Sequence, residues 1–234
     1  MLTRAVPAPV AVVVAVPAHE EQDLLPACLA SLQVAAAQPG LPPVRVVVVA
    51  DGCTDRTAEV ARAAGVDVLE VGLRSAGAAR RHGLDAAVDG AGVPLELLWL
   101  ATTDADSQVP AEWFVDHLRW RALGWDAVAG TVAVDDWQGH VRGVAERFST
   151  RYAWDGPDHP HVHGANLSLS AAAYRAVGGF PPLALAEDHA LVAALEARGL
   201  RVARAGTRPV LTSARRDPRS SGGFGELLQT LAEG

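Results

Sequence analysis

The chain has 234 residues, enough to bury roughly 70–75% of the surface that its unfolded form exposes. Half of the residues are hydrophobic and 20% are charged, which excludes an intrinsically disordered protein. All 20 basic residues are arginine, so enzymes that depend on a Walker-type, Schiff-base or nucleophilic lysine are excluded. The net charge of −7 argues against nucleic acid as a partner.

Cysteine usage and hydropathy indicate where the protein works. Cys28 and Cys53 are too few for a four-cysteine zinc site or a disulfide scaffold, so we expect a reducing compartment and a cytoplasmic location. The longest apolar runs, residues 10–18 and 46–50, are shorter than the ~20 residues of a membrane span. We expect no signal peptide, because prolines interrupt the first 18 residues and no cleavage site follows.

The first half of the chain alternates β-branched runs with amphipathic segments, a pattern typical of a parallel sheet covered on both faces. The strands that we expect comprise residues 10–16, 44–50, 66–71, 95–101 and 126–134. The helices that we expect comprise residues 21–37, 55–64, 76–88 and 110–123, and Thr54 or Asp55 is the expected N-cap of the second.

The second half has a different character. Residues 135–160 show no clean alternation, and their aromatic side chains (Trp137, Tyr152 and Trp154) suit either a small core or stacking on an acceptor. We expect a strand at 165–170, loops at 178–182 and 218–225, and helices at 187–198 and at the end of the chain. No linker or internal repeat divides the sequence, so we predict one α/β domain over residues 1–234.

Ligands of open parallel sheets bind outside the carboxyl ends of the strands, so we expect the binding residues in the loops there. The first such loop, residues 17–21, lacks the glycine fingerprint of dinucleotide-binding proteins. The second, residues 51–57, begins with Asp51 and Gly52. Asp51 is suited to a hydrogen bond with a ribose or a base, and the alternative is a turn that leads into a helix cap.

The loop after the fourth expected strand carries Asp104 and Asp106. Two carboxylates at positions i and i+2 repel each other, and a divalent cation removes that repulsion. Mg²⁺ or Mn²⁺ held by carboxylates typically also binds diphosphate oxygens. The alternative is a plain polar loop.

Together, these loops resemble the pattern of glycosyltransferase family 2 on a GT-A fold. The motifs that carry the resemblance are VPAHEE at 16–21, DGCTDRT at 51–57, the DxD element Asp104-Ala105-Asp106, GAN at 164–166, GGF at 178–180 and the acidic pair Glu187-Asp188. The resemblance covers residues 10–215. It implies a Rossmann-like, mostly parallel central sheet flanked by helices, with a smaller acceptor-side region in the second half. Residues 1–107 would then bind the nucleotide, residues 108–215 the acceptor, and 216–234 would form a C-terminal tail.

The resemblance also implies roles for single residues on the donor side. The residues that would bind the nucleotide sugar are Pro17, Ala18, Glu20, Asp51, Arg80, Asp104 and Ala105. Asp51 would contact the base or ribose, and Asp104 the ribose or a metal-bound water. Asp106 would ligate Mg²⁺ or Mn²⁺, which offsets the negative charge that develops on the diphosphate leaving group.

On the acceptor side, the resemblance implies that Asp188 is the general base, with Glu187 beside it. A hydroxyl nucleophile needs such a carboxylate within hydrogen-bond reach. Without the resemblance, two acids at a helix start would simply complement the helix macrodipole. His163 is a candidate third metal ligand together with Asp104 and Asp106, and His159 and His161 are further candidates, although histidines in a loop are often only solvated.

Residues 212–216 stand where some members of the family place a metal-binding histidine. Here they supply arginines, which suit bidentate hydrogen bonds to a diphosphate. Because the membrane helices of processive members are missing, we expect a soluble enzyme that adds one sugar at a time.

The function that the resemblance implies is metal-dependent, inverting transfer of a sugar from a nucleoside-diphosphate donor, UDP- or GDP-linked, to an acceptor hydroxyl. Two alternatives remain open. One is a metal-dependent hydrolase in which His159, His161 and His163 join Asp104 and Asp106 in a two-metal centre. The other is a domain that binds nucleotide sugars without catalysis.

Overall fold

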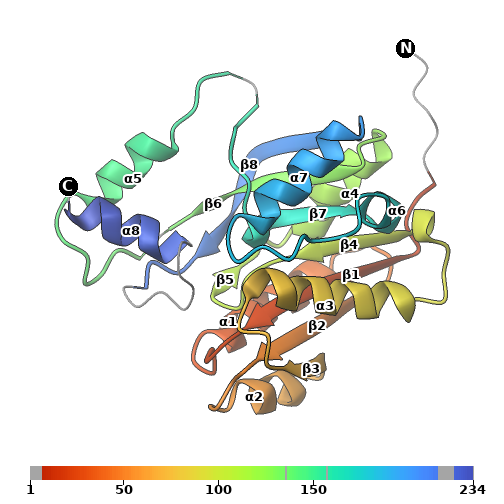
Figure 1. The fold of residues 1–234 in the computed structure, drawn as a ribbon, viewed down its shortest axis with the longest axis horizontal. Helices are drawn as coiled ribbons and strands as arrows, with labels where there is room; N and C mark the ends of the chain where they lie inside the picture. The colour runs from red at the N-terminus through yellow and green to blue at the C-terminus, as the bar shows by residue number, and fades with distance from the viewer. Residues whose placement is uncertain (1–6, 135, 157, 216–223, 234) are drawn as a thin grey trace.

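A computed structural model describes residues 7–134, 136–156, 158–215 and 224–233 of the chain (Figure 1). Its centre is one eight-stranded sheet with the strand order β3-β2-β1-β4-β7-β6-β8-β5. The strands are β1 (Ala11–Ala18), β2 (Val44–Asp51), β3 (Asp67–Val71), β4 (Leu98–Thr102), β5 (Ser107–Gln108), β6 (Ala127–Ala133), β7 (Leu167–Ser170) and β8 (Val202–Thr212). Strands β1 to β4 are mutually parallel, whereas β7 runs antiparallel to β4 and β6, and β5 antiparallel to β8. The expected mostly parallel α/β sheet is therefore confirmed.

Helices cover both faces of this sheet (Figure 1). One face packs against α3 (Ala76–Asp89), α6 (Ala171–Ala176) and α7 (Glu187–Ala197), and the other against α1 (Leu25–Ala36), α2 (Thr57–Ala63) and α4 (Trp113–Ala122). Strand β1 supplies both cores, because Val13 and Ala15 point into the first while Val12 and Val14 point into the second. A strand buried on both faces needs the continuous apolar sequence that residues 10–16 have.

A third, smaller core lies beyond the end of β6 and β8. Helices α5 (Val144–Tyr152) and α8 (Phe224–Glu233) pack together there, on the left of Figure 1. Phe148, Ala214 and Leu228 form its buried centre, and Trp137 and Tyr152 pack against it. Two of the aromatic residues between 135 and 160 therefore contribute to a small core.

Several element boundaries differ from those expected from sequence. Helix α1 begins at Leu25 rather than at residue 21, because the N–H groups of Glu21 and Gln22 bond to side chains of the next loop, at Thr57 and Asp55. The expected strands at 95–101 and 165–170 each begin with a turn of 3₁₀-helix (Leu95–Leu97 and Gly164–Asn166). The N-cap of α2 is Arg56 rather than the expected Thr54 or Asp55, and its side chain makes no capping hydrogen bond. The Asp55 carboxylate instead accepts the N–H of Thr57, the first residue of α2.

Four elements had no counterpart in the expectations: α5, α6, β5 and β8. Strand β8 is the most important, because it runs parallel to β6 and its end pairs with the short strand β5. Glycine and proline within its sequence, together with a register shift opposite Gly130 and Val132, hide the usual strand pattern. The expected loop at 218–225 lies outside the described residues except for its last two positions, and Arg216 and residues 1–6 lie outside them entirely.

The loops singled out by sequence all follow the carboxyl ends of neighbouring strands. Residues 17–21 end β1, Asp51 ends β2 and the DxD element follows β4. Strands β1 and β4 are adjacent, and the strand order reverses between them. This reversal is the position where open α/β sheets bind their ligands. Among the described residues, no helix has the length and apolar character needed to cross a membrane.

Candidate active site

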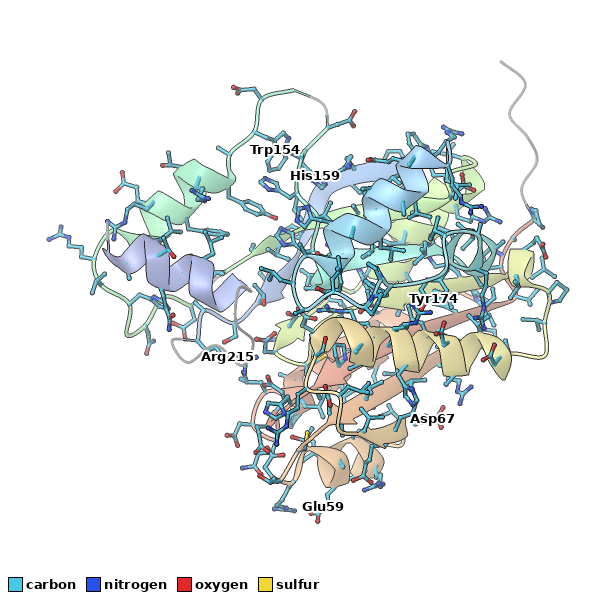
Figure 2. All side chains as sticks on the ribbon, in the orientation of Figure 1. Glu59, Asp67, Trp154, His159, Tyr174 and Arg215 are labelled. Carbon is cyan, nitrogen blue, oxygen red and sulfur yellow. The ribbon has the colours of Figure 1, made fainter. Side chains whose placement is uncertain are left out.

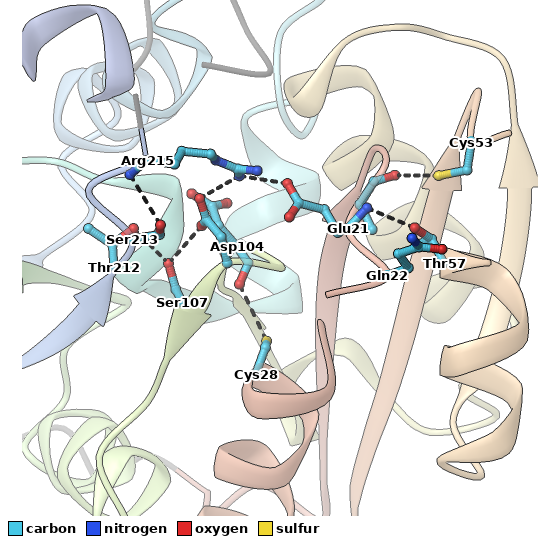
Figure 3. Close-up of polar contacts among 12 residues, drawn as sticks. Glu21, Gln22, Cys28, Cys53, Thr57, Asp104, Ser107, Thr212, Ser213 and Arg215 are labelled. Atoms are coloured by element: carbon cyan, nitrogen blue, oxygen red, sulfur yellow. Dashed lines mark hydrogen bonds and ion pairs between the residues drawn. The ribbon is translucent and has the colours of Figure 1, made fainter. Parts of the chain in front are cut away.

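The loops that follow β1 and β2 are bonded to each other. A carboxylate oxygen of Glu20 accepts hydrogen bonds from the N–H (2.6 Å) and the hydroxyl (3.0 Å) of Thr54. The thiol of Cys53 donates to the carbonyl of Ala18 at 3.4 Å, and the N–H of Glu21 donates to the Thr57 hydroxyl at 2.8 Å (Figure 3). The Glu20 carboxylate therefore joins the two loops, and Pro17 and Ala18 are buried at the end of β1.

Asp51 holds a third loop in place. Its side chain is only 4% exposed and accepts three backbone hydrogen bonds, from Leu73 (2.5 Å), Arg74 (2.8 Å) and Ser75 (2.8 Å). Arg74 has a positive φ of 51°, a strained conformation that these bonds help to maintain. Asp51 thus fixes the segment between β3 and α3, and its own contact with a nucleotide remains a prediction.

Arg80 connects the DxD loop to the acidic pair of α7. Its guanidinium, on α3, forms ion pairs with Asp104 and with Glu187, and the Arg80 side chain is 7% exposed. Burial alone would lower the pKa of Arg80, but the two carboxylates outweigh burial and raise it. The single positive charge of Arg80 therefore pairs with two acids from distant parts of the chain, and its guanidinium is buried within the site.

Two glycines make room for this arrangement. A Cβ atom at Gly77 would lie 2.4 Å from Cγ of Glu187, and one at Gly164 would lie 2.5 Å from Cζ of Arg80. Both distances are far below van der Waals contact, so any side chain at either position would displace the ion pairs. Gly164 of the GAN motif is thus required by close packing on Arg80.

Asp106 has a different arginine as its partner. Nη2 of Arg215 contacts Oδ2 of Asp106 at 2.5 Å and Oε1 of the buried Glu21 at 2.6 Å, and Figure 3 shows Arg215 between the two loops. The hydroxyl of Ser107 donates to Oδ1 of Asp106 at 3.2 Å. Burial raises the pKa of Asp106, while the charge of Arg215 acts in the opposite direction. Each DxD carboxylate is therefore paired with its own arginine.

Asp188 stands at the start of α7 with its carboxylate half-buried. Oδ2 accepts the N–H of Gly164 and Oδ1 the N–H of His189, both at 2.8 Å. These bonds orient the carboxylate and leave further lone pairs on both oxygens for an incoming hydroxyl. Ala186, directly before the helix, has a positive φ of 58°, which turns the chain sharply into α7.

His163 is hydrogen-bonded to a tyrosine of α5. The Tyr152 hydroxyl accepts the N–H of Val132 and lies 2.9 Å from Nε2 of His163. Burial lowers the pKa of His163 to about 4, which favours the neutral ring. Nε2 of His163 would have to give up its hydrogen bond with Tyr152 before it could ligate a metal.

The three histidines between 159 and 163 form a ladder of stacked rings. Ring centroids are 5.8 Å apart for His159 and His161 and 6.1 Å apart for His161 and His163. His161 also stacks on Tyr152 at 3.8 Å, and His159 faces Trp154 at 5.6 Å (Figure 2). In the part of the chain that the structure describes, no three histidine, cysteine, aspartate or glutamate side chains gather to hold a metal. The geometry therefore gives no support to the two-metal hydrolase alternative.

Asp104 and Asp106 are nevertheless hard oxygen donors of the kind that Mg²⁺ and Mn²⁺ prefer. Such cations are commonly held by one or two carboxylates and complete their coordination with substrate phosphates and water. Asp104 is about one-third exposed, whereas Asp106 is only 12% exposed and bound to Arg215. The residues present fit a cation that the diphosphate of a substrate helps to hold, rather than one held by protein ligands alone.

Three residues of this site were missed by sequence reasoning. Glu21 was read only as part of a loop motif, yet it is the buried acid that meets Arg215. Tyr152 was read as an aromatic residue, and its hydroxyl forms a hydrogen bond with His163. Asn166 bonds the indole of Trp113 and the carbonyl of Thr131, and so fixes the GAN turn below Asp188. Their position in recognisable motifs was the only available signal for Glu21 and Asn166.

Solved structures with the same fold include several glycosyltransferases. S. aureus TarS in complex with UDP matches with a TM-score of 0.59 and 16% identity, over 88% of this chain and 61% of that one. The mannosyltransferase PcManGT from Pyrobaculum calidifontis, in complex with GDP-Man and Mn²⁺, matches with a TM-score of 0.65 and 17% identity. The match covers 97% of this chain and 70% of that one. Glucosyl-3-phosphoglycerate synthase from Mycobacterium tuberculosis, in complex with Mn²⁺, UDP-glucose and phosphoglyceric acid, matches with a TM-score of 0.60 and 16% identity. The match covers 95% of this chain and 76% of that one.

At these identities, the likeness establishes the GT-A fold alone. The chain spans 37% of one TarS structure and about 60% of two others. No match was found among curated proteins. The family model described as "Glycosyl transferase family 2" matches residues 13–178, which include the loops after β1, β2 and β4 and the GAN motif. The chain therefore belongs to glycosyl transferase family 2.

Proposed function

We propose that the protein is a metal-dependent, inverting glycosyltransferase that moves a sugar from a UDP- or GDP-linked donor to an acceptor hydroxyl. Residues 1–107 would bind the nucleotide and residues 108–215 the acceptor, within one domain. Relatives of the same fold carry UDP, GDP-Man or UDP-glucose, which supports a nucleoside-diphosphate donor. Both cysteines are free, in keeping with a reducing, cytoplasmic compartment.

The observation that carries this proposal is the ion-pair bridge of Arg80. It joins Asp104 of the donor-side DxD loop to Glu187, the neighbour of Asp188 on the acceptor side. A transferase must hold donor and acceptor in one fixed geometry, because correct orientation of two reactants supplies a large part of the rate enhancement. A rigid link between the two acidic motifs meets that requirement.

The chemistry of the acceptor side follows from Asp188. As the acceptor oxygen bonds to the anomeric carbon, the bond from that carbon to the diphosphate oxygen breaks, and its electron pair leaves with the diphosphate. The hydroxyl proton passes to the Asp188 carboxylate, which the N–H groups of Gly164 and His189 hold in position. A single displacement assisted by one base inverts the anomeric carbon.

Glu187 has a supporting role in this scheme. Its carboxylate is buried and bound to Arg80, and burial raises its pKa. It positions Arg80 against Asp104, whereas Asp188 on the same helix turn receives the proton. A divalent cation at Asp106, when bound, would act as a Lewis acid that stabilises the negative charge of the leaving diphosphate.

The experiment that tests this function is a transfer assay with UDP- and GDP-linked sugars, Mn²⁺ and a panel of hydroxyl-bearing acceptors. Proton NMR of the product reads the configuration of its anomeric carbon. We expect release of the nucleoside diphosphate with inverted configuration. A retained configuration would overturn both the inverting label and the role of Asp188, and donor binding without any turnover would favour a non-catalytic binding domain.

A further inference from the structure

Arg215 makes an unusually concentrated set of contacts at the DxD loop. A single nitrogen, Nη2, meets Oε1 of Glu21 at 2.6 Å and Oδ2 of Asp106 at 2.5 Å. The three side chains are 22%, 5% and 12% exposed, in the order Arg215, Glu21 and Asp106. With Ser107 on Oδ1, both oxygens of Asp106 have a partner. Any cation that binds Asp106 through Oδ2 must first displace Arg215.

Other charges near Asp106 do not replace Arg215. Arg80 is already bound to Asp104 and Glu187, so it has two acids of its own to neutralise. Without Arg215, the repulsion of Asp106 by Asp104 would no longer be offset, and Glu21 would lose its ion pair with Arg215. Asp106 and Glu21 raise the pKa of Arg215 against the opposing effect of burial, so the guanidinium remains a full positive charge. Arg215 thus occupies the electrostatic position that a divalent cation would take.

The backbone around Arg215 is anchored, so its side chain can exchange partners without any rearrangement of the sheet. The hydroxyls of Ser107 and Thr212 bond at 3.0 Å where β5 pairs with β8. The N–H of Ser213 donates to the carbonyl of Asp106 at 3.2 Å. Rotation of one long side chain is therefore enough to move the guanidinium from Asp106 to a ligand above the loop.

We infer that Arg215 and a divalent cation compete for Asp106, and that entry of the cation releases Arg215 to bind the diphosphate of the donor. The inference rests on the proposed function, since it needs a metal-bridged diphosphate. A planar guanidinium matches two phosphate oxygens in a bidentate fashion, so the released side chain gains a better acceptor than it loses. The cation and the diphosphate then bind cooperatively, and in the free chain Arg215 offsets part of the negative charge of the acidic loop.

The test compares the full chain with Arg215→Gln, which removes the charge and leaves a shorter but still polar side chain. Arg208→Gln is the matched control, because Arg208, on β8, likewise pairs with two acids, Asp116 at 3.0 Å and Glu112 at 3.4 Å. Mn²⁺ binding without nucleotide is followed by electron paramagnetic resonance. UDP binding at saturating Mn²⁺ is followed by calorimetry.

We expect Arg215→Gln to bind Mn²⁺ about tenfold more tightly in the absence of nucleotide and UDP about tenfold more weakly at saturating Mn²⁺. Arg208→Gln should match the parent chain in both. If the Mn²⁺ and UDP affinities of Arg215→Gln both stay within about twofold of those of the parent, Arg215 only stabilises the loop and the inference is wrong. Arg215→Met, which also removes the charge, is the second variant if the first does not fold, and a shift in the same two directions supports the exchange.

The same data separate the inference from the proposed function. If the parent chain binds UDP equally well with Mn²⁺ and with EDTA, the metal-bridged donor site is wrong, and the exchange is wrong with it. If Mn²⁺ strengthens UDP binding in the parent chain and in Arg215→Gln alike, the donor site stands and the exchange alone is overturned.

Discussion

Arg80 and Glu187 are 107 residues apart in the sequence and form a buried ion pair at the centre of the site. The same guanidinium also binds Asp104, 24 residues further along from Arg80. Breaking a buried ion pair by removing one partner typically costs about 3–5 kcal/mol, because a charge is left without compensation. The fold and the catalytic geometry therefore depend on the same contact.

Gly77→Ala tests this dependence without altering any charged residue. The new methyl carbon would lie 2.4 Å from Cγ of Glu187, so we expect Glu187 to be pushed off Arg80 and the transfer rate to fall about 10²-fold. Alanine favours the helix by about 1 kcal/mol over glycine, which offsets part of the packing cost. The measurement is kcat, with thermal unfolding as a check on the fold.

Gly72→Ala is the control for this variant. No atom lies within 4 Å of a Cβ built at Gly72, so we expect kcat close to that of the parent chain. A Gly77→Ala variant with unchanged kcat would show that the position of Glu187 does not matter to the reaction.

Asp188→Asn should abolish transfer but retain binding of the nucleotide sugar. An amide cannot accept the proton of the acceptor hydroxyl, and loss of a general base typically costs about 10²–10⁴-fold in rate. Steady-state rates and donor affinity measured on the same preparation separate the two effects.

Glu196→Gln provides a control on the same helix, because Glu196 pairs with Arg204 at 2.7 Å on the surface, away from Asp188. We expect its rate to match that of the parent chain. A loss of less than tenfold in Asp188→Asn would remove Asp188 from the proton-transfer step.

Asp51→Ala should both loosen the segment after β3 and weaken nucleotide binding. Three backbone N–H groups lose their charged acceptor, and hydrogen bonds to charged groups contribute about 1.5–3 kcal/mol each at most. We expect faster hydrogen exchange over residues 73–75 and UDP affinity lower by about 1–3 kcal/mol. Faster exchange with unchanged UDP affinity would mean that Asp51 acts only as a loop-former.

The sequence was sufficient to predict the sheet around β1, β2 and β4, because strands buried on both faces leave continuous apolar runs. It also placed Asp104 and Asp106 in a loop at the carboxyl end of a strand, whereas Asp188 was identified only through the resemblance of its motif. It could not show that the Asp51 carboxylate accepts hydrogen bonds from three backbone N–H groups, because an aspartate at this position is equally suited to contact a ligand. Nor could it predict the partners of Arg80 and Arg215, because ion pairs between distant segments depend on tertiary packing.

His163 predicts a pH dependence of stability. Burial lowers its pKa to about 4 from an ordinary value of 6.5. Between these values the unfolded chain binds a proton that the folded chain does not, so stability is lost as the pH falls from 6.5 to about 4, by about 3 kcal/mol. Urea unfolding of His163→Gln should therefore show a smaller loss over this range than the parent chain.

The exposed His82 supplies the comparison for that experiment. His82→Gln should follow the pH dependence of the parent chain. Identical pH profiles for His163→Gln and the parent would contradict a neutral, buried His163 held by Tyr152.

A crystal structure with UDP and Mn²⁺ is the most direct test of the donor site. We expect the nucleotide at the carboxyl ends of β1, β2 and β4, with the cation between its diphosphate and Asp106 and with Arg215 turned from Asp106 to the diphosphate. The contradictory result is UDP bound elsewhere, for example in the cavity of about 270 Å³ lined by Trp113, His117 and Trp120, with the Arg215–Asp106 pair intact.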